Sequence, residues 1–133
     1  MKPFHIEIVT PDGLVYDGET ESLLVRTDTG DVEILAGHTD YVAAIATGRA
    51  RLLKDGVKRF AAVNGGFLSV KGGNVKLVTI TFEFADQIDL SRAKAAKERA
   101  EATLATAKGQ RDEKIVKAKL ARAISRIKVA ELK

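Results

Sequence analysis

The sequence predicts an all-β sandwich followed by an antiparallel α-helical hairpin, and three observations support this fold class. Apolar and polar residues alternate in short runs, separated by turn signals, as far as residue 82. Ten of the 11 glycines lie before residue 89. Beyond that point alanine is abundant, and apolar residues recur at spacings of three and four, the period of a helix face. We therefore predict a β-sandwich domain over residues 1–86 and a two-helix hairpin over residues 87–133.

The first strand is indicated by Phe4, Ile6 and Ile8, which occupy every second position. Further strand-like runs are found at residues 22–25, 57–63, 67–70 and 75–82. Turn residues separate these runs at 11–13, 29–30, 54–56, 64–66 and 71–74. No segment between the runs is long enough for a helical crossover, so the pattern favours antiparallel pairing over βαβ units.

The first helix can begin after either of two capping residues, Asp86 or Asp89. Its apolar face comprises Leu90, Ala93, Ala96, Ala100, Leu104 and Ala107. A break at residues 108–110 precedes a second helix, which we expect to open at Asp112. The apolar stripe of that helix comprises Val116, Leu120, Ala123, Ile127 and Ala130. A short break between helices of similar length predicts an antiparallel pair.

Alanine dominates the predicted seam of the hairpin. Because burial stabilises by about 25 cal/mol per Å² of apolar surface, an alanine seam contributes far less than a leucine seam. The helices themselves have high intrinsic propensity. Strong helices with a weak mutual interface predict an element that can change its arrangement.

Charge and motifs exclude several classes of function. The net charge of +4 conceals a net of −3 over residues 1–88 and +7 over residues 89–133. The chain has no Cys, and its two histidines, His5 and His38, are far apart, so we expect no metal site. Catalytic motifs and runs of the roughly 20 apolar residues that span a membrane are absent. The basic half has no aromatic residue to stack bases, so a protein partner with an acidic patch explains its charge as well as nucleic acid does.

Four arginines are the strongest candidates for a binding site. Arg92 and Arg99 are seven residues apart, and Arg122 and Arg126 are four apart, so each pair shares a helix face. In an antiparallel hairpin the two pairs can converge, and a polyphosphate would then neutralise them. A solvated basic face is the alternative, with the lysines at 94, 97, 114, 117, 119 and 128 as part of it.

The sequence resembles the epsilon subunit of bacterial F-type ATP synthases over its full length. The segment Ile88-Asp89-Leu90-Ser91-Arg92-Ala93 matches the I/L-D-x-x-R-A motif of that family. Residues 8–16, the Gly37-His38 loop and residues 64–70 also resemble it. Two positions depart from the family pattern, because Glu33 and Ala36 stand in the segment that usually reads G-I-L-P-G-H.

The resemblance implies a non-catalytic central-stalk subunit. Its implied partners are the gamma subunit, the rotor ring of the membrane sector and, through the basic C-terminal helix, an acidic region of the catalytic beta subunits. No nucleic acid and no direct membrane insertion are implied. The implied location is the cytoplasmic face of the bacterial plasma membrane, as a peripheral protein.

The resemblance also implies a hairpin with two arrangements, folded against the sandwich or extended so that it inhibits ATP hydrolysis. In several bacterial members the folded form binds ATP as a regulatory ligand. The matching positions are Glu83, Ile88, Asp89, Arg92, Ala93, Arg99, Arg122 and Arg126. Carboxylates at 83 and 89 would accept hydrogen bonds from adenine, and the arginines would neutralise the triphosphate. Any need for Mg²⁺ is left open, as is a rival in which the hairpin inhibits without meaningful ATP affinity.

Overall fold

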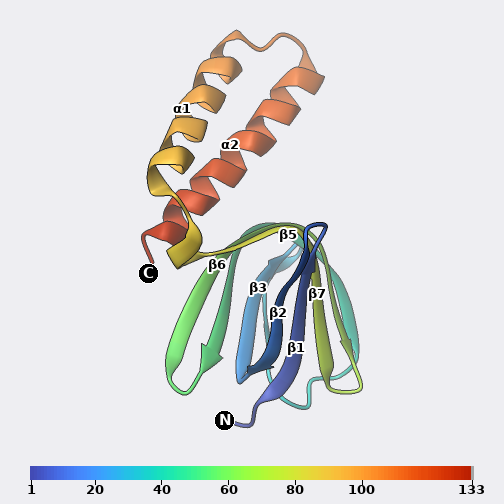
Figure 1. The fold of residues 1–133 in the computed structure, drawn as a ribbon. Coiled ribbons are helices and arrows are strands. Elements are labelled where there is room, and N and C mark those ends of the chain that lie inside the picture. Colours follow the sequence, from blue (N-terminus) through green and yellow to red (C-terminus); the bar gives the residue numbers. More distant parts are fainter. Residues whose placement is uncertain (133) are drawn as a thin grey trace.

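The computed structural model describes residues 1–132 as a β-sandwich that carries a helical hairpin at one end (Figure 1). This confirms the predicted fold class. The strands are β1 (Phe4–Thr10), β2 (Gly13–Thr20), β3 (Ser22–Thr27), β4 (Gly30–Ile34), β5 (Tyr41–Lys54), β6 (Val57–Lys71) and β7 (Asn74–Phe84). A short 3₁₀ helix, η1 (Ala85–Gln87), leads to α1 (Leu90–Thr106) and α2 (Gln110–Ala130). Of these strands, β2, β4 and β5 lie entirely outside the runs that the sequence indicated.

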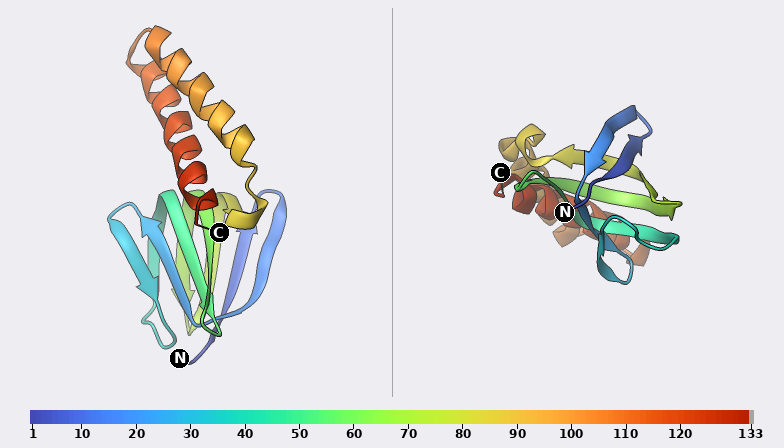
Figure 2. Two further views of the ribbon diagram at one scale, coloured as in Figure 1. Left: turned by 90° about the vertical axis from the view of Figure 1, so that its left-hand side faces the viewer. Right: turned by 90° about the horizontal axis from the view of Figure 1, so that it is seen from below.

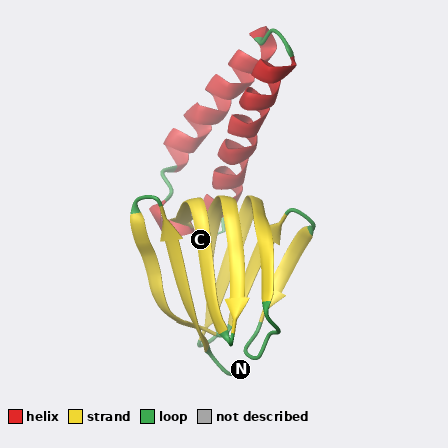
Figure 3. Cartoon of the chain, turned by 90° about the vertical axis from the view of Figure 1, so that its right-hand side faces the viewer, coloured by secondary structure: helices red, strands yellow, loops and turns green. Residues whose placement is uncertain are grey.

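All seven strands belong to one continuous sheet in the order β2-β1-β7-β6-β5-β3-β4. Every neighbouring pair is antiparallel except β1 and β7, which are parallel. The sheet forms two layers because its long strands bend at the end nearest the hairpin (Figures 1 and 3). At the bend, the pairing of β5 with β6 is interrupted between Ala44–Phe67 and Gly48–Val63.

Two glycines make the bend in β6 possible. Gly65 and Gly66 have φ values of +64° and +111°, a region that residues with a Cβ rarely adopt. A Cβ on Gly66 would lie 1.9 Å from the carbonyl oxygen of Val78 on β7. The expected turn at residues 64–66 is therefore wrong: β6 continues through this segment, and the glycines allow a bend and close approach of strands instead of a reversal.

The sandwich core is built from large aliphatic and aromatic side chains. Ile6, Ile8, Leu68 and Leu77 are fully buried in it. Phe82 and Phe84 also face this core, as strand alternation predicts, so Glu83 between them points to the opposite side.

The helices begin where short-range signals place them. Asp89 caps α1, because its carboxylate accepts a hydrogen bond from the backbone N–H of Arg92 at 3.1 Å. Asp86 lies in η1 and is not that cap. The second helix begins at Gln110 after Gly109, two residues before the expected Asp112, which lies in its first turn.

The hairpin stands on the sandwich through its base (Figure 2). The last residues of α2, Val129 and Ala130, pack in a second, smaller buried cluster, which we call the docking cluster. Its other members are Ala62, Ala85, Ile88 and Ala93. Between the helices, Ala100 and Ala123 are buried. Within residues 1–132, no helix has the length and apolarity needed to span a bilayer.

Candidate functional site

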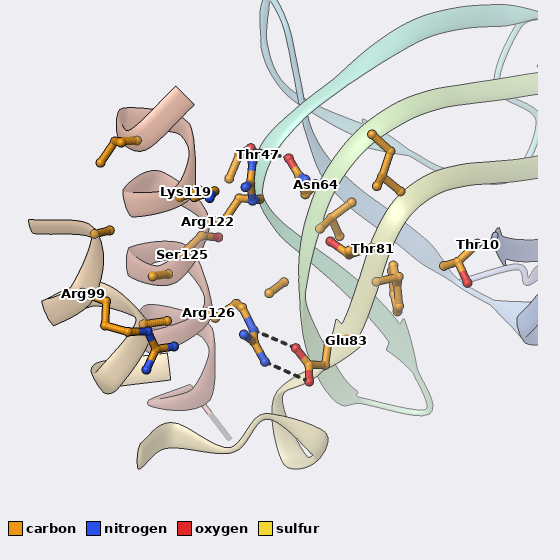
Figure 4. Close-up of a pocket in the computed structure, with 18 of the residues that line it drawn as sticks. Thr10, Thr47, Asn64, Thr81, Glu83, Arg99, Lys119, Arg122, Ser125 and Arg126 are labelled. Atoms are coloured by element: carbon orange, nitrogen blue, oxygen red, sulfur yellow. Dashed lines mark hydrogen bonds and ion pairs between the residues drawn. The ribbon is translucent and has the colours of Figure 1, made fainter. Parts of the chain in front are cut away.

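A cavity of about 820 Å³ lies between the hairpin and the bent part of the sandwich (Figure 4). Both units line it. The sandwich contributes residues of the strand bends, among them Thr47, Asn64, Thr81 and Glu83. The hairpin contributes a basic wall that comprises Arg99 of α1 with Lys119, Arg122 and Arg126 of α2. The site therefore exists only while the hairpin is docked.

One end of the cavity is closed by an ion pair between α2 and β7. Arg126 Nε donates to Glu83 Oε1 at 2.9 Å, and Arg126 Nη2 donates to Glu83 Oε2 at 3.3 Å. Both side chains are about one-third exposed. The arrangement is bidentate, which fixes geometry as well as charge. It ties the hairpin to the sandwich and leaves this end of the cavity nearly neutral.

The other end of the cavity is cationic. Neither Arg122 nor Lys119 forms an ion pair with any residue in the described part of the chain. Figure 4 shows both side chains extending from α2 toward Thr47 and Asn64. Arg122 is partly buried and Lys119 is exposed. Neighbouring like charges that lack a carboxylate partner repel each other, and a bound anion reduces that repulsion.

A direct bond also connects α2 to the strand bend. Ser125 Oγ donates to the carbonyl oxygen of Gly48 at 3.2 Å. The two contacts, through Ser125 and Arg126, lie at successive positions of α2, whereas α1 contacts the sandwich mainly near its start through Ala93. Docking of the hairpin thus depends chiefly on α2.

The structure divides the eight residues of the sequence prediction into two groups. Glu83, Arg99, Arg122 and Arg126 line the cavity. The four motif residues do not. Ile88 and Ala93 are buried in the docking cluster, Asp89 caps α1, and the side chain of Arg92 is exposed.

Several polar residues of the cavity were not among the predicted set, and Lys119, Thr47 and Asn64 illustrate why. Lys119 lies three residues before Arg122, so helical spacing alone was a usable signal for it. Thr47 and Asn64 carried no such signal, because only the bend of β5 and β6 brings them to the hairpin. Residues 1–132 contain no group of three or more His, Asp or Glu side chains placed to hold a metal ion.

Comparison with known families assigns both units of the chain. Residues 3–85 match the family described as "ATP synthase, Delta/Epsilon chain, beta-sandwich domain". Residues 86–131 match "ATP synthase, Delta/Epsilon chain, long alpha-helix domain". The two matches together cover nearly the whole chain.

Curated relatives agree with this assignment. The ATP synthase epsilon chain of Bacillus velezensis is 44% identical over 130 residues, which is 98% of each chain. That of Bacillus licheniformis is 44% identical over 132 residues, covering 98% of this chain and 99% of the relative. The epsilon chain of Caldanaerobacter subterraneus is 38% identical over 130 residues, covering 97% and 94%.

Solved structures share the fold at lower identity. A chain in the Euglena gracilis mitochondrial ATP synthase assembly of OSCP, F1 and c-ring has a TM-score of 0.80 and 22% identity, covering 96% of this chain and 80% of that chain. A chain in the central stalk and c-ring of Tetrahymena thermophila mitochondrial ATP synthase has a TM-score of 0.65 and 10% identity, covering 95% of each. Given full-length matches in sequence and family, this chain belongs to the ATP synthase delta/epsilon family, among the epsilon chains of bacterial F-type ATP synthases.

Proposed function

We propose that this chain is a non-catalytic rotor subunit that senses ATP through its docked hairpin and inhibits ATP hydrolysis when the hairpin is released. The observation that carries the proposal is the cavity shared by hairpin and sandwich, with Arg99, Arg122 and Arg126 on one wall and Glu83 on the other. A ligand that fills it contacts both units, so its binding favours the docked arrangement.

The polarity of the cavity matches a nucleoside triphosphate. The end at Glu83 offers carboxylate oxygens, which accept hydrogen bonds from the amino group of adenine. The end at Arg122 and Lys119 offers cations, which bind phosphate oxygens. The carbonyl at the corresponding position of guanine accepts hydrogen bonds instead of donating them, so a carboxylate there favours ATP over GTP.

The energies involved fit a switch. The docking cluster is made mostly of small residues, four of them alanines that are at least 95% buried, so the hairpin is docked through little apolar area. A ligand specific to the docked form adds RT ln(1 + [L]/Kd), about 2.7 kcal/mol at a hundredfold excess over Kd. A contribution of that size is enough to set which arrangement dominates.

The outer face of the sandwich offers an apolar surface for a stalk partner, which we propose to be the gamma subunit. This surface is a row of cross-strand neighbours on four adjacent strands, namely Val9, Val78, Phe67 and Ala44. Leu14 on β2 extends the row. Phe67 is 46% exposed and Leu14 is 60% exposed. An exposed apolar row of this length indicates a protein contact.

The remaining partners follow from the proposed role. The rotor ring of the membrane sector would contact the sandwich. The basic α2, once released, would meet the acidic region of the catalytic beta subunits. The chain would then act at the cytoplasmic face of the plasma membrane as a peripheral subunit.

Titration of the full-length chain with ATP and with GTP tests the proposal. We expect saturable ATP binding at millimolar concentrations or below, weaker GTP binding, and increased protection of hairpin amides from hydrogen exchange. Arg122→Gln should weaken binding, whereas Arg111→Gln, an exposed change on the same helix outside the cavity, should not. A folded chain that binds no ATP would defeat the proposal.

One observation favours the alternative, a coupling and inhibitory subunit without meaningful ATP affinity. Glu83 and Arg126 already satisfy each other, and Arg92 is exposed away from the cavity. In that case the ion pair, the docking cluster and the bond from Ser125 to Gly48 would hold the hairpin without a ligand. The same titration separates the two functions, because the alternative predicts no saturable signal with either nucleotide.

A further inference from the structure

The chain has two asparagines, and the residues that follow them differ. Asn64 precedes Gly65, whereas Asn74 precedes the β-branched Val75. The side-chain amide of an asparagine can be lost when the backbone nitrogen of the next residue attacks it, and a bulky side chain on that residue hinders the attack. Glycine has no Cβ and hinders it least. The sequence therefore indicates Asn64, and not Asn74, as a position where the amide can be lost.

The bend of β6 leaves the attacking nitrogen outside the regular strand pairing. The register of β6 with β7 gives partners to Asn64 and Gly66, but neither neighbouring strand gives a partner to Gly65. The φ of Gly65, +64°, also departs from extended strand geometry. A regular ladder holds each N–H toward the adjacent strand. The backbone nitrogen of Gly65 is less constrained than that of a paired strand residue.

The amide of Asn64 is held at its oxygen and not at its nitrogen. Thr47 Oγ1 donates a hydrogen bond to Asn64 Oδ1 at 2.7 Å. This bond draws electron density from the amide carbon and makes that carbon more electrophilic. The amide nitrogen, which is the leaving group, has no hydrogen bond with any residue in the described part of the chain. Asn64 is partly exposed and lines the cavity, so water reaches it.

We propose that Asn64 is a deamidation site of the folded chain. The backbone nitrogen of Gly65 attacks Cγ of Asn64, and a new N–Cγ bond forms. The amide nitrogen leaves as ammonia, which also takes up the proton of the Gly65 nitrogen. Water then opens the resulting succinimide ring. Cleavage of the new N–Cγ bond gives aspartate, and cleavage of the original peptide bond gives isoaspartate, so both products carry a carboxylate in place of the amide.

The new carboxylate would lie among cations that lack one. Lys119 and Arg122 line the same cavity, and neither forms an ion pair within residues 1–132. Figure 4 shows both side chains extending toward Asn64. Because Asn64 belongs to the sandwich and the cations belong to α2, an ion pair between them joins the two units. Deamidation would thus hold the hairpin more firmly on the sandwich without any ligand.

Incubation of the full-length chain in mildly alkaline buffer, followed by peptide mapping with mass spectrometry, tests the reaction. We expect Asn64 to lose its amide at least about tenfold faster than Asn74, because glycine does not hinder ring closure. Asn74 is a stringent internal control because it is the more exposed of the two, so exposure alone predicts the reverse order. Equal or reversed rates would overturn the proposal, as would a loss at Asn64 that occurs only in chain unfolded by urea.

The contribution of the hydrogen bond from Thr47 has its own test. Thr47→Val removes the hydroxyl and keeps the shape of the side chain. The variant should lose the Asn64 amide more slowly than the parent when folded, and at the same rate as the parent in urea. An unchanged or faster loss in the folded variant would contradict the role given to this bond. Circular dichroism confirms that the variant is folded.

Asn64→Asp carries one product of the reaction and tests its consequence. Without nucleotide, hydrogen exchange of hairpin amides should slow by about two- to fivefold, the range for a partly exposed ion pair, and the effect should shrink as salt is added. Asn74→Asp adds the same charge outside the cavity and should leave this exchange unchanged. No slowing in Asn64→Asp, or equal slowing in both variants, would overturn the effect on docking. These outcomes are independent of ATP binding, because no nucleotide is present.

Discussion

The sandwich and the hairpin of this chain bury different kinds of side chain, and the difference bears on how firmly each unit is held. The sandwich core contains fully buried Ile6, Leu23, Leu68 and Leu77. The cluster that docks the hairpin holds four alanines among its six buried residues. Since stabilisation scales with apolar area, we expect the sandwich to keep its fold if the hairpin is released.

The two units also differ in how their parts are connected. Each interior strand of the sandwich is hydrogen-bonded to neighbours on both sides. The helices satisfy their own backbone groups. Beyond the docking cluster, side-chain hydrogen bonds from Ser125 to Gly48 and from Arg126 to Glu83 join the hairpin to the sandwich. A helix can leave such a contact without exposing unpaired backbone, whereas a strand cannot.

The largest effect is expected from a cavity in the sandwich core. Leu68→Ala should lower the free energy of unfolding by about 2–5 kcal/mol, because Leu68 is fully buried. Urea unfolding followed by circular dichroism measures this loss. Val42→Ala, at a position 72% exposed, should change it by no more than about 0.5 kcal/mol. Equal effects of the two variants would contradict the conclusion that the buried core of the sandwich provides most of the free energy of unfolding.

A bulky residue in the docking cluster should affect the hairpin instead. Ala93 has no exposed surface, so Ala93→Leu should weaken docking by about 1–3 kcal/mol and leave the unfolding of the sandwich almost unchanged. Energy transfer between dyes on introduced Val57→Cys and Lys108→Cys reports the position of the hairpin in this cysteine-free chain. Ala105→Leu, exposed on the same helix, is the control. A sandwich destabilised as much as the hairpin would show that the units are not independent.

Loss of the helix cap should have a smaller effect. Asp89→Ala removes the bond to the N–H of Arg92, at a cost of about 1 kcal/mol to the start of α1. Hydrogen exchange of amides in the first turn should accelerate. Asp86→Ala is the matched control, because that carboxylate caps no helix. Equal exchange in the two variants would argue against the assigned cap.

The smallest effect is expected from the ion pair at the cavity. Glu83→Gln should weaken docking in the absence of nucleotide by less than about 1 kcal/mol, because both partners are about one-third exposed to water. The change should shrink as salt is added. Glu98→Gln, exposed on α1, serves as the control, and the dye pair above gives the measurement. Complete release of the hairpin by this one substitution would show that the docking cluster contributes almost nothing.

Local patterns accounted for much of the fold. Alternation located β1, and the period of alanines located both helices to within a few residues. The Asn64-Gly65-Gly66 segment misled the interpretation, because glycine pairs serve both turns and bends and only the neighbouring strands distinguish them. The strand over residues 41–54 lacked strict alternation, since its buried side changes at the bend.

The candidate site was predictable only on its helical side. Spacing placed Arg122 and Arg126 on one face, and the structure places both at the cavity together with Arg99. Spacing also paired Arg92 with Arg99, yet Arg92 is exposed outside the cavity. Arg92 lies in the first turn of α1, whereas the cavity is lined by residues farther along that helix.

The amino-acid sequence by itself determined the order of the two units, their opposite charges and the small size of the side chains that join them, because periodicity and composition are local properties of the chain. Tertiary structure alone decided which polar groups share a cavity. Thr47, Asn64 and Glu83 lie on three different strands, and they face Arg122 only because the sheet bends beneath the hairpin. Contacts of this kind depend on long-range strand pairing, which short-range patterns do not encode.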